Sequence, residues 1–321
     1  MSTVDTFDPI PVAEFIDRIL ELYRPPLRAK ATYTRMRQVL GIVGAMGVET
    51  TADLNTSFVA RFVAARAAKG EHPNTTASLL SSLRAACGLA SDEGWIRRSP
   101  FARRRRWVQA VTPRPPVYHG RQEIARALDL ARCEIGEASG WEQWKARRLY
   151  ALLATVAFSG MRKNEALHLR TEDVDQDRRL LMIVARKGHR LKTAASGQPV
   201  PLAVPLAAIL ADWIQFINPG WLFPTMTRAD RPWTGGVQGT KPLDQLQALG
   251  RRAGVEGLGF LSLRHSWATL AQHWGFSSLE IARVLRHTST RTQAHYLHPD
   301  ADGLRRMADR IDFGPPGAGP Q

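Results

Sequence analysis

The segment Leu285–His298, LRHTSTRTQAHYLH, holds a tyrosine in a setting that suits nucleophilic chemistry. Tyr296 is one of only five tyrosines, stands between two histidines and follows a run of hydroxyl and cationic side chains. A phenol has a pKa of about 10 and becomes a usable nucleophile where cationic neighbours favour its anion. Tyr296 is therefore either a packing residue or a nucleophile, depending on the residues that accompany it.

Two arginines, a glutamate and a histidine precede this tyrosine. Arg162 follows a glycine that ends an expected helix, and Glu165 lies one turn further on, where it can orient the guanidinium. Arg264 lies at the start of another expected helix, and His287 lies nine residues before Tyr296. Each alone has a structural explanation, because such an Arg–Glu pair is commonly a surface ion pair and such a histidine complements a helix dipole.

Taken in order, these residues resemble the tyrosine recombinase (phage integrase) family. That family's pattern has a G-x-R-x-x-E turn, a hairpin lysine, H-x-x-R, a G-H or G-W pair, and a tyrosine about nine residues later. Here GMRKNE supplies Arg162 and Glu165, and LRHSWATL, which follows the usual L-R-H-[ST]-x-A-T run, supplies Arg264. LRHTSTRTQAHYLH matches L-G-H-x-S-x-x-T-T-x-x-Y-x-H, which places His287 and Tyr296.

The hairpin lysine and one histidine position depart from a simple match. KTAASGQPVPL resembles K-T-x-x-S-x-R-x-V-P-L and assigns Lys192, whereas Lys187 in RKGH resembles the alternative K-G form; we favour Lys192. Three positions before Arg264 the pattern has histidine, but this chain has Leu261, which can neither donate a hydrogen bond nor shuttle a proton. His265 would point elsewhere on a helix and does not replace it.

The resemblance implies cleavage and rejoining of DNA through a 3′-phosphotyrosine, with no metal, ATP or other cofactor. Arg162 and Arg264 would neutralise the non-bridging phosphate oxygens, because a guanidinium is a planar fork of donors that stays protonated. His287 would add a donor, Lys192 would protonate the leaving 5′-oxygen, and Tyr296 would be the nucleophile.

The partner implied by the resemblance is double-stranded DNA, bound by a homotetramer on two sites and by a monomer or dimer without DNA. The segment DGLRRMADRIDF after Tyr296 would dock on a neighbouring protomer. Two alternatives stay open: a catalytically impaired DNA-binding protein of the same fold, which Leu261 would explain, and a type IB topoisomerase-like relaxing enzyme.

The charge balance independently favours a polyanionic partner. The 321 residues include 44 Lys and Arg against 29 Asp and Glu, for a net charge of +15, and both halves are basic. No apolar run approaches the roughly 20 residues of a membrane span, and the N-terminus lacks a secretory signal. Cys87 and Cys133 have no CxxC or His partners, so no metal site is indicated. We expect a cytoplasmic protein of the bacterial nucleoid with no membrane contact.

The expected fold is mainly α with a small β-hairpin or sheet in the C-terminal domain, forming a two-domain clamp around DNA. Residues 1–108 read as a helical unit that resembles the family's core-binding, SAM-like domain, with helices at 12–20, 31–46, 56–68 and one capped by Asn74. Residues 109–120 are proline-rich and predict a linker.

The predicted catalytic domain covers residues 121–313, and a disordered tail covers 314–321. Its predicted elements are helices at 123–132, 144–158, 204–216, 242–253, 262–276 and 279–287, and paired strands at 179–185 and 198–204. Gly160 is expected to cap the second of these helices in a left-handed conformation. Ser277 and Glu280 form a capping box that opens the last helix.

Overall fold

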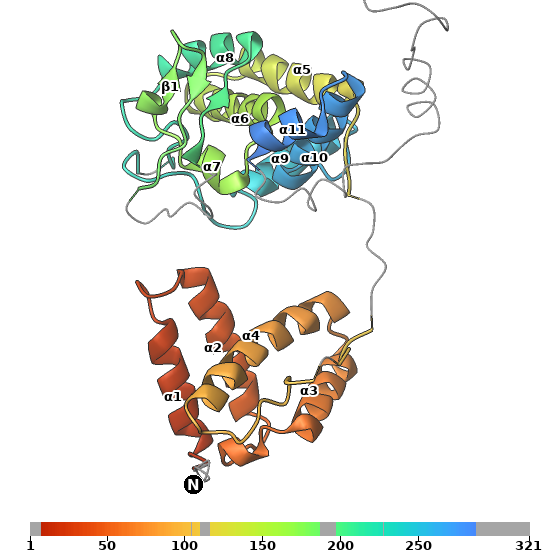
Figure 1. Ribbon diagram of the computed structural model, residues 1–321. Coiled ribbons are helices and arrows are strands. Elements are labelled where there is room, and N and C mark those ends of the chain that lie inside the picture. Colours follow the sequence, from red (N-terminus) through yellow and green to blue (C-terminus); the bar gives the residue numbers. More distant parts are fainter. Residues whose placement is uncertain (1–7, 104, 110–115, 187–196, 227, 287–321) are drawn as a thin grey trace, which may run out of the picture. The chain divides into compact units, whose positions relative to one another are not determined.

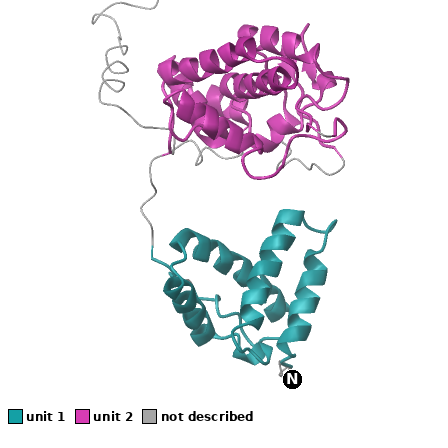
Figure 2. Ribbon diagram, turned by 180° about the vertical axis from the view of Figure 1, so that it is seen from behind, with its two compact units in different colours: residues 1–114 teal, residues 115–321 magenta. Residues whose placement is uncertain are grey.

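The computed structural model describes residues 8–103, 105–109, 116–186, 197–226 and 228–286. The chain divides into two compact units, residues 1–114 and 115–321, each with its own hydrophobic core (Figures 1 and 2). The finer predicted boundaries, with a linker at 109–120, stay a prediction. The predicted tail at 314–321 lies outside the described residues.

The first unit is helical, as predicted, because apolar residues recur every three to four positions along its helices. Phe15, Phe58, Phe62 and Leu83 lie at the centre of its core. The elements are α1 (Val12–Tyr23), α2 (Lys30–Gly44), η1 (Thr51–Asp53), α3 (Thr56–Ala68) and α4 (Pro73–Asp92).

The predicted cap of α4 is wrong by two positions. The helix begins at Pro73, and Asn74 lies inside its first turn. His72 is the capping residue, and its Nδ1 accepts a hydrogen bond from the backbone N–H of Asn74 at 3.2 Å. A proline is favoured at the first helical position, because its fixed φ suits the helix and its missing N–H is not needed there.

The second unit is built around α6, which packs against α5, α7, α8, α9 and α10. Figure 1 shows α6 in the interior of this unit. Leu152, Leu153 and Val156 of α6 are completely buried. Its helices are α5 (Arg121–Glu137), α6 (Gly140–Ser159), α7 (Lys163–Leu167), η2 (Thr171–Asp173), α8 (Val204–Ile214), α9 (Pro242–Arg252), α10 (Phe260–His273) and α11 (Ser278–Leu285).

A small antiparallel sheet lies at one side of this unit, in the order β1-β2-β3. Its strands are β1 (Val174–Asp175), β2 (Leu180–Leu181) and β3 (Val200–Pro201). The predicted pairing of β2 with β3 is confirmed, with Leu181 opposite Val200, although the strands are much shorter than predicted. β1 was not predicted, because two residues are too few to show an alternating pattern.

The turn between α10 and α11 carries the predicted capping box. The N–H of Ser277 donates to Glu280 Oε2 at 2.7 Å, and the N–H of Glu280 donates to Ser277 Oγ at 3.3 Å. The predicted end of this helix at residue 287 is wrong, since α11 ends at Leu285 and Arg286 follows in a left-handed conformation. Within the described residues, no helix is long and apolar enough to cross a membrane.

Candidate active site

The turn after α6 brings the first predicted arginine to the ends of two other helices. Gly160 caps α6 with φ 60°, as predicted. A Cβ at Gly160 would lie 2.7 Å from Leu285 Cδ2 and 3.1 Å from Trp267 Cγ. Glycine is therefore required twice, for the positive φ and for the close approach of α10 and α11. Arg162 follows at the N-cap of α7.

The predicted contact between Arg162 and Glu165 is present. Arg162 Nη1 donates to Glu165 Oε1 at 2.8 Å, and the N–H of Arg162 donates to Oε2 at 2.9 Å. The Glu165 side chain is 5% exposed, whereas that of Arg162 is 31% exposed. Glu165 thus holds the guanidinium from the protein side and leaves part of it open to solvent.

Arg264 lies in the first half of α10 and is buried. Its Nη1 donates to the carbonyl of Gly160 at 2.7 Å, and its Nη2 donates to the carbonyl of Leu285 at 2.6 Å. It therefore joins the end of α6 to the end of α11.

Both arginines meet at the C-terminal end of α11. Arg162 Nη2 donates to the carbonyl of Arg286 at 3.2 Å, next to the Leu285 carbonyl that Arg264 contacts. The last carbonyls of a helix lack intrahelical partners and carry partial negative charge, so they attract guanidinium groups. The structure thus brings Arg162, Glu165 and Arg264 together at the residue that precedes His287.

Arg286 is a fourth member of this cluster that the sequence patterns did not single out. Its Nη2 contacts Glu165 Oε2 at 2.5 Å, so that one carboxylate is shared by two arginines. Burial by itself raises the pKa of Glu165, but the charge of Arg286 and the hydrogen bonds from Arg162 outweigh burial, and this pKa lies below its ordinary value. The available signal was the L-R-H sequence, which has arginine where the family pattern has glycine.

Comparison with known proteins decides the family. The sequence profile of the phage integrase family matches residues 135–302, slightly more than half of the chain. The chain belongs to the phage integrase family. Tyrosine recombinase XerD of Brucella suis is 27% identical over 295 residues, covering 90% of this chain and 89% of the relative. Tyrosine recombinase XerC of Mycobacterium sp. strain KMS is 28% identical over 259 residues, covering 78% and 80%.

Solved structures of other integrases share the fold. A Tn1549 transposon integrase in complex with a circular intermediate DNA has a TM-score of 0.73 and 15% identity, covering 94% of this chain and all of that one. A lambda integrase dimer bound to a COC′ core site has a TM-score of 0.66 and 16% identity, covering 97% and 83%. The predicted fold class and enzyme class, a tyrosine recombinase, are confirmed, and both alternatives are less favoured.

Several positions of the phage integrase pattern lie outside the described residues: Lys187, Lys192, His287 and Tyr296. Their predicted roles stay predictions. Arg186, the last described residue before the two lysines, contacts Asp173 Oδ1 through Nη2 at 2.6 Å.

Leu261 and His265 of α10 are the two side chains that lie at or near the position where the family pattern has histidine. Leu261 is 66% exposed, so its side chain lies on the outer face of the helix. His265 is half-buried and lies about 100° further around the helix than Arg264, since an α-helix has about 3.6 residues per turn. Neither observation supplies a replacement for the histidine.

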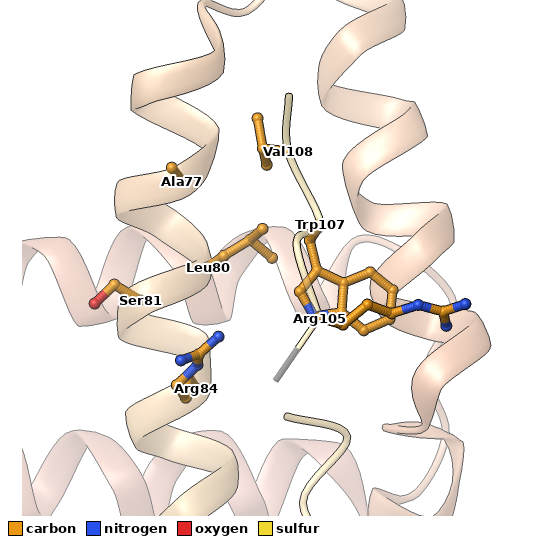
Figure 3. A pocket seen from close by; sticks show the side chains of 7 residues that line it. All are labelled: Ala77, Leu80, Ser81, Arg84, Arg105, Trp107 and Val108. Carbon is orange, nitrogen blue, oxygen red and sulfur yellow. The ribbon is translucent and has the colours of Figure 1, made fainter. Parts of the chain in front are cut away.

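The helical unit has a basic hollow between α4 and the segment that follows Phe101 (Figure 3). The hollow has a volume of about 300 Å³, and Arg84, Arg105 and Trp107 lie along it. Trp107 Nε1 is buried and has no hydrogen-bond partner among the residues that the structure describes, and the Arg105 guanidinium lies 5.3 Å from the Trp107 ring centre. The two arginines make this hollow a candidate DNA contact, because arginine side chains commonly contact the phosphate oxygens of DNA.

Proposed function

We propose that this tyrosine recombinase cleaves and rejoins double-stranded DNA at specific sites through a 3′-phosphotyrosine on Tyr296. The observation that carries the proposal is the meeting of Arg162 and Arg264 at the end of α11, directly before His287. Similar proteins are named tyrosine recombinases, and solved relatives are described in complex with DNA. The protein would act in the cytoplasm, at the bacterial nucleoid.

The two arginines would stabilise the charge that develops on the phosphate. A guanidinium has five N–H donors, so Arg162 can keep its contacts with Glu165 and Arg286 while other N–H groups face a phosphate. Its 31% exposure leaves it accessible to a phosphate from solution. Arg264 is buried at 5% exposure, and its fixed contacts to Gly160 and Leu285 hold it in place beforehand.

The covalent step transfers the phosphoryl group from a 5′-oxygen to the tyrosine. Tyr296 gives its phenolic proton to water, its oxygen bonds to phosphorus, and the bond between phosphorus and the 5′-oxygen breaks. Lys192 gives the departing 5′-oxygen a proton, and His287 donates a hydrogen bond to the phosphate. Attack by a 5′-hydroxyl from a second strand reverses the step, so no ATP or metal is consumed.

A nicked suicide substrate tests the covalent step. Wild type should form a denaturation-resistant DNA adduct, and Tyr296→Phe should form none. Tyr118→Phe is a matched control, because Tyr118 is an exposed tyrosine of the same unit, and it should keep the adduct. An adduct of undiminished yield in Tyr296→Phe would remove Tyr296 from this role.

Strand exchange distinguishes recombination from the remaining alternatives. Four protomers on two DNA sites should exchange labelled strands between the sites, whereas a topoisomerase-like enzyme would relax supercoils as a monomer without exchange. A DNA-binding protein without chemistry would shift the mobility of its site and form no adduct.

A further inference from the structure

Arg286 is held in an unusual backbone conformation at the end of α11. Its φ is 55°, and in the described part of the chain it shares a positive φ with only one other non-glycine residue, Arg179. A side chain in this region is disfavoured and persists where surrounding contacts determine it. Glycine, the residue of the family pattern, would adopt the same conformation without cost. The arginine side chain must therefore be retained by its contacts.

Those contacts lead directly to the candidate active site. The Arg286 side chain is 1% exposed and bonds to Glu165 Oε2 at 2.5 Å. Its Nη1 donates to the carbonyl of Val284 at 2.9 Å, within the last turn of α11. Its own carbonyl accepts the hydrogen bond from Arg162 Nη2 at 3.2 Å. The side chain of Arg286 thus contacts Glu165, and its main chain contacts Arg162.

The charges of Arg162, Glu165 and Arg286 explain what Arg286 adds to the site. Arg162 and Glu165 alone would form a neutral pair, and the carboxylate would offset the positive charge that Arg162 can present to a phosphate. With Arg286 the group carries a net charge of +1. Glu165 is 5% exposed, so its charge is weakly screened by water and the compensation by Arg286 is strong.

We propose that Arg286 is a positioning residue of the cleavage site. It neutralises the charge of Glu165 and fixes the turn before His287. The positive charge of Arg162 is then not offset, and its guanidinium stays directed toward the scissile phosphate. The proposal rests on the proposed function for the identity of that phosphate. Since Leu261 offers no donor where the family pattern has histidine, the site depends more on its arginines. Arg286 acts through Arg162 and does not itself contact the DNA.

Single-turnover cleavage and DNA affinity of three variants test the proposal. Arg286→Met removes the charge and keeps much of the volume, Arg286→Lys keeps a charge, and Arg286→Gly restores the residue of the pattern and relieves the backbone. Met and Gly should slow cleavage by about 10- to 100-fold, the range found for residues that orient metal ligands. The DNA dissociation constant should change by less than about threefold, and Lys should recover part of the rate.

The decisive comparison adds Glu165→Gln to Arg286→Met. If Arg286 acts by neutralising Glu165, removal of the carboxylate charge should make the double variant cleave at least about tenfold faster than Arg286→Met. A residue with only a structural role gives a different result: the double variant cleaves no faster than Arg286→Met, and Arg286→Gly cleaves as fast as wild type. Either of these outcomes overturns the proposal.

Binding of inorganic phosphate separates this proposal from the proposed function. Measured by ³¹P NMR titration, the component of phosphate binding that Arg162→Ala abolishes should weaken in Arg286→Met and recover with Glu165→Gln. Absence of a DNA adduct in wild type would reject the recombinase chemistry but leave this measurement intact. Equal phosphate affinity in wild type and Arg286→Met would reject the role of Arg286 even if wild type cleaves DNA.

Discussion

At the scale of single residues, Arg162 and the hairpin lysine are assigned different tasks that one change in the DNA can separate. A 5′-bridging phosphorothiolate has a leaving group that needs no proton, so it should restore cleavage by Lys192→Ala to near the wild-type rate. It should not restore Arg162→Ala, because the non-bridging oxygens still need their charge neutralised, a contribution of roughly 3–4 kcal/mol for an oxyanion donor. Single-turnover rates on both substrates measure this. Rescue of Lys187→Ala and not of Lys192→Ala would reverse the choice of lysine.

The same scale shows which site contacts a sequence can reveal. The Arg162–Glu165 contact was predictable, because residues three apart on a helical turn face each other. The contact of Arg286 with Glu165 spans 121 positions, and no local pattern contains both residues. Arg264 was placed on the correct helix, but its acceptors, the carbonyls of Gly160 and Leu285, follow from tertiary packing.

At the scale of elements, Gly160 is the point where α6, α10 and α11 meet. Gly160→Ala should lower the stability of the catalytic unit by about 2–4 kcal/mol, combining the cost of a left-handed alanine with that of overpacking against Leu285 and Trp267. Cleavage should fall as well, because Arg264 contacts the carbonyls of Gly160 and Leu285. The thermal unfolding midpoint of the full chain and the adduct yield measure the two effects.

Gly254→Ala is the matched control for Gly160→Ala. Gly254 has a φ of 67° in the same unit, and a Cβ there would have no neighbour within 4 Å. Its substitution should cost only the backbone term, about 1–2 kcal/mol, and leave the adduct yield unchanged. Equal destabilisation by the two substitutions would mean that the close approach at Gly160 contributes nothing.

Helices were predictable along most of the chain, because each has an apolar face that repeats with its turn; α3 has the predicted bounds, Thr56–Ala68. The end of α11 was not predictable. Arg286 follows the helix in a left-handed conformation and forms an ion pair with Glu165, which is distant in the sequence. The sheet was predicted too long, because the apolar run at 180–185 continues beyond the two residues of β2 that pair. Ile183 belongs to this apolar run because it is buried, although it lies outside the residues that pair in the sheet.

At the scale of the whole molecule, each of the two units has a separate core and a basic composition. If both units contact DNA, each should release counterions, and the log of the binding constant should fall by about 0.9 per phosphate contact for each unit of log salt concentration. Residues 1–114 and 115–321, expressed separately, should each show a shallower slope than the full chain. The full slope in one fragment alone would contradict binding by both units.

The hollow of the helical unit allows the same argument to be tested in the intact chain. Arg84 and Arg105 line it together with Trp107. If each arginine contacts one phosphate, the double substitution Arg84→Gln and Arg105→Gln should reduce the salt slope by about 1.8 and weaken binding similarly on specific and unrelated DNA. Arg18→Gln is the control, because Arg18 is paired with Glu14 on α1 and should leave the slope unchanged. Fluorescence anisotropy over a range of salt concentrations measures the slopes; an unchanged slope in the double variant would place the DNA contact of this unit on another surface.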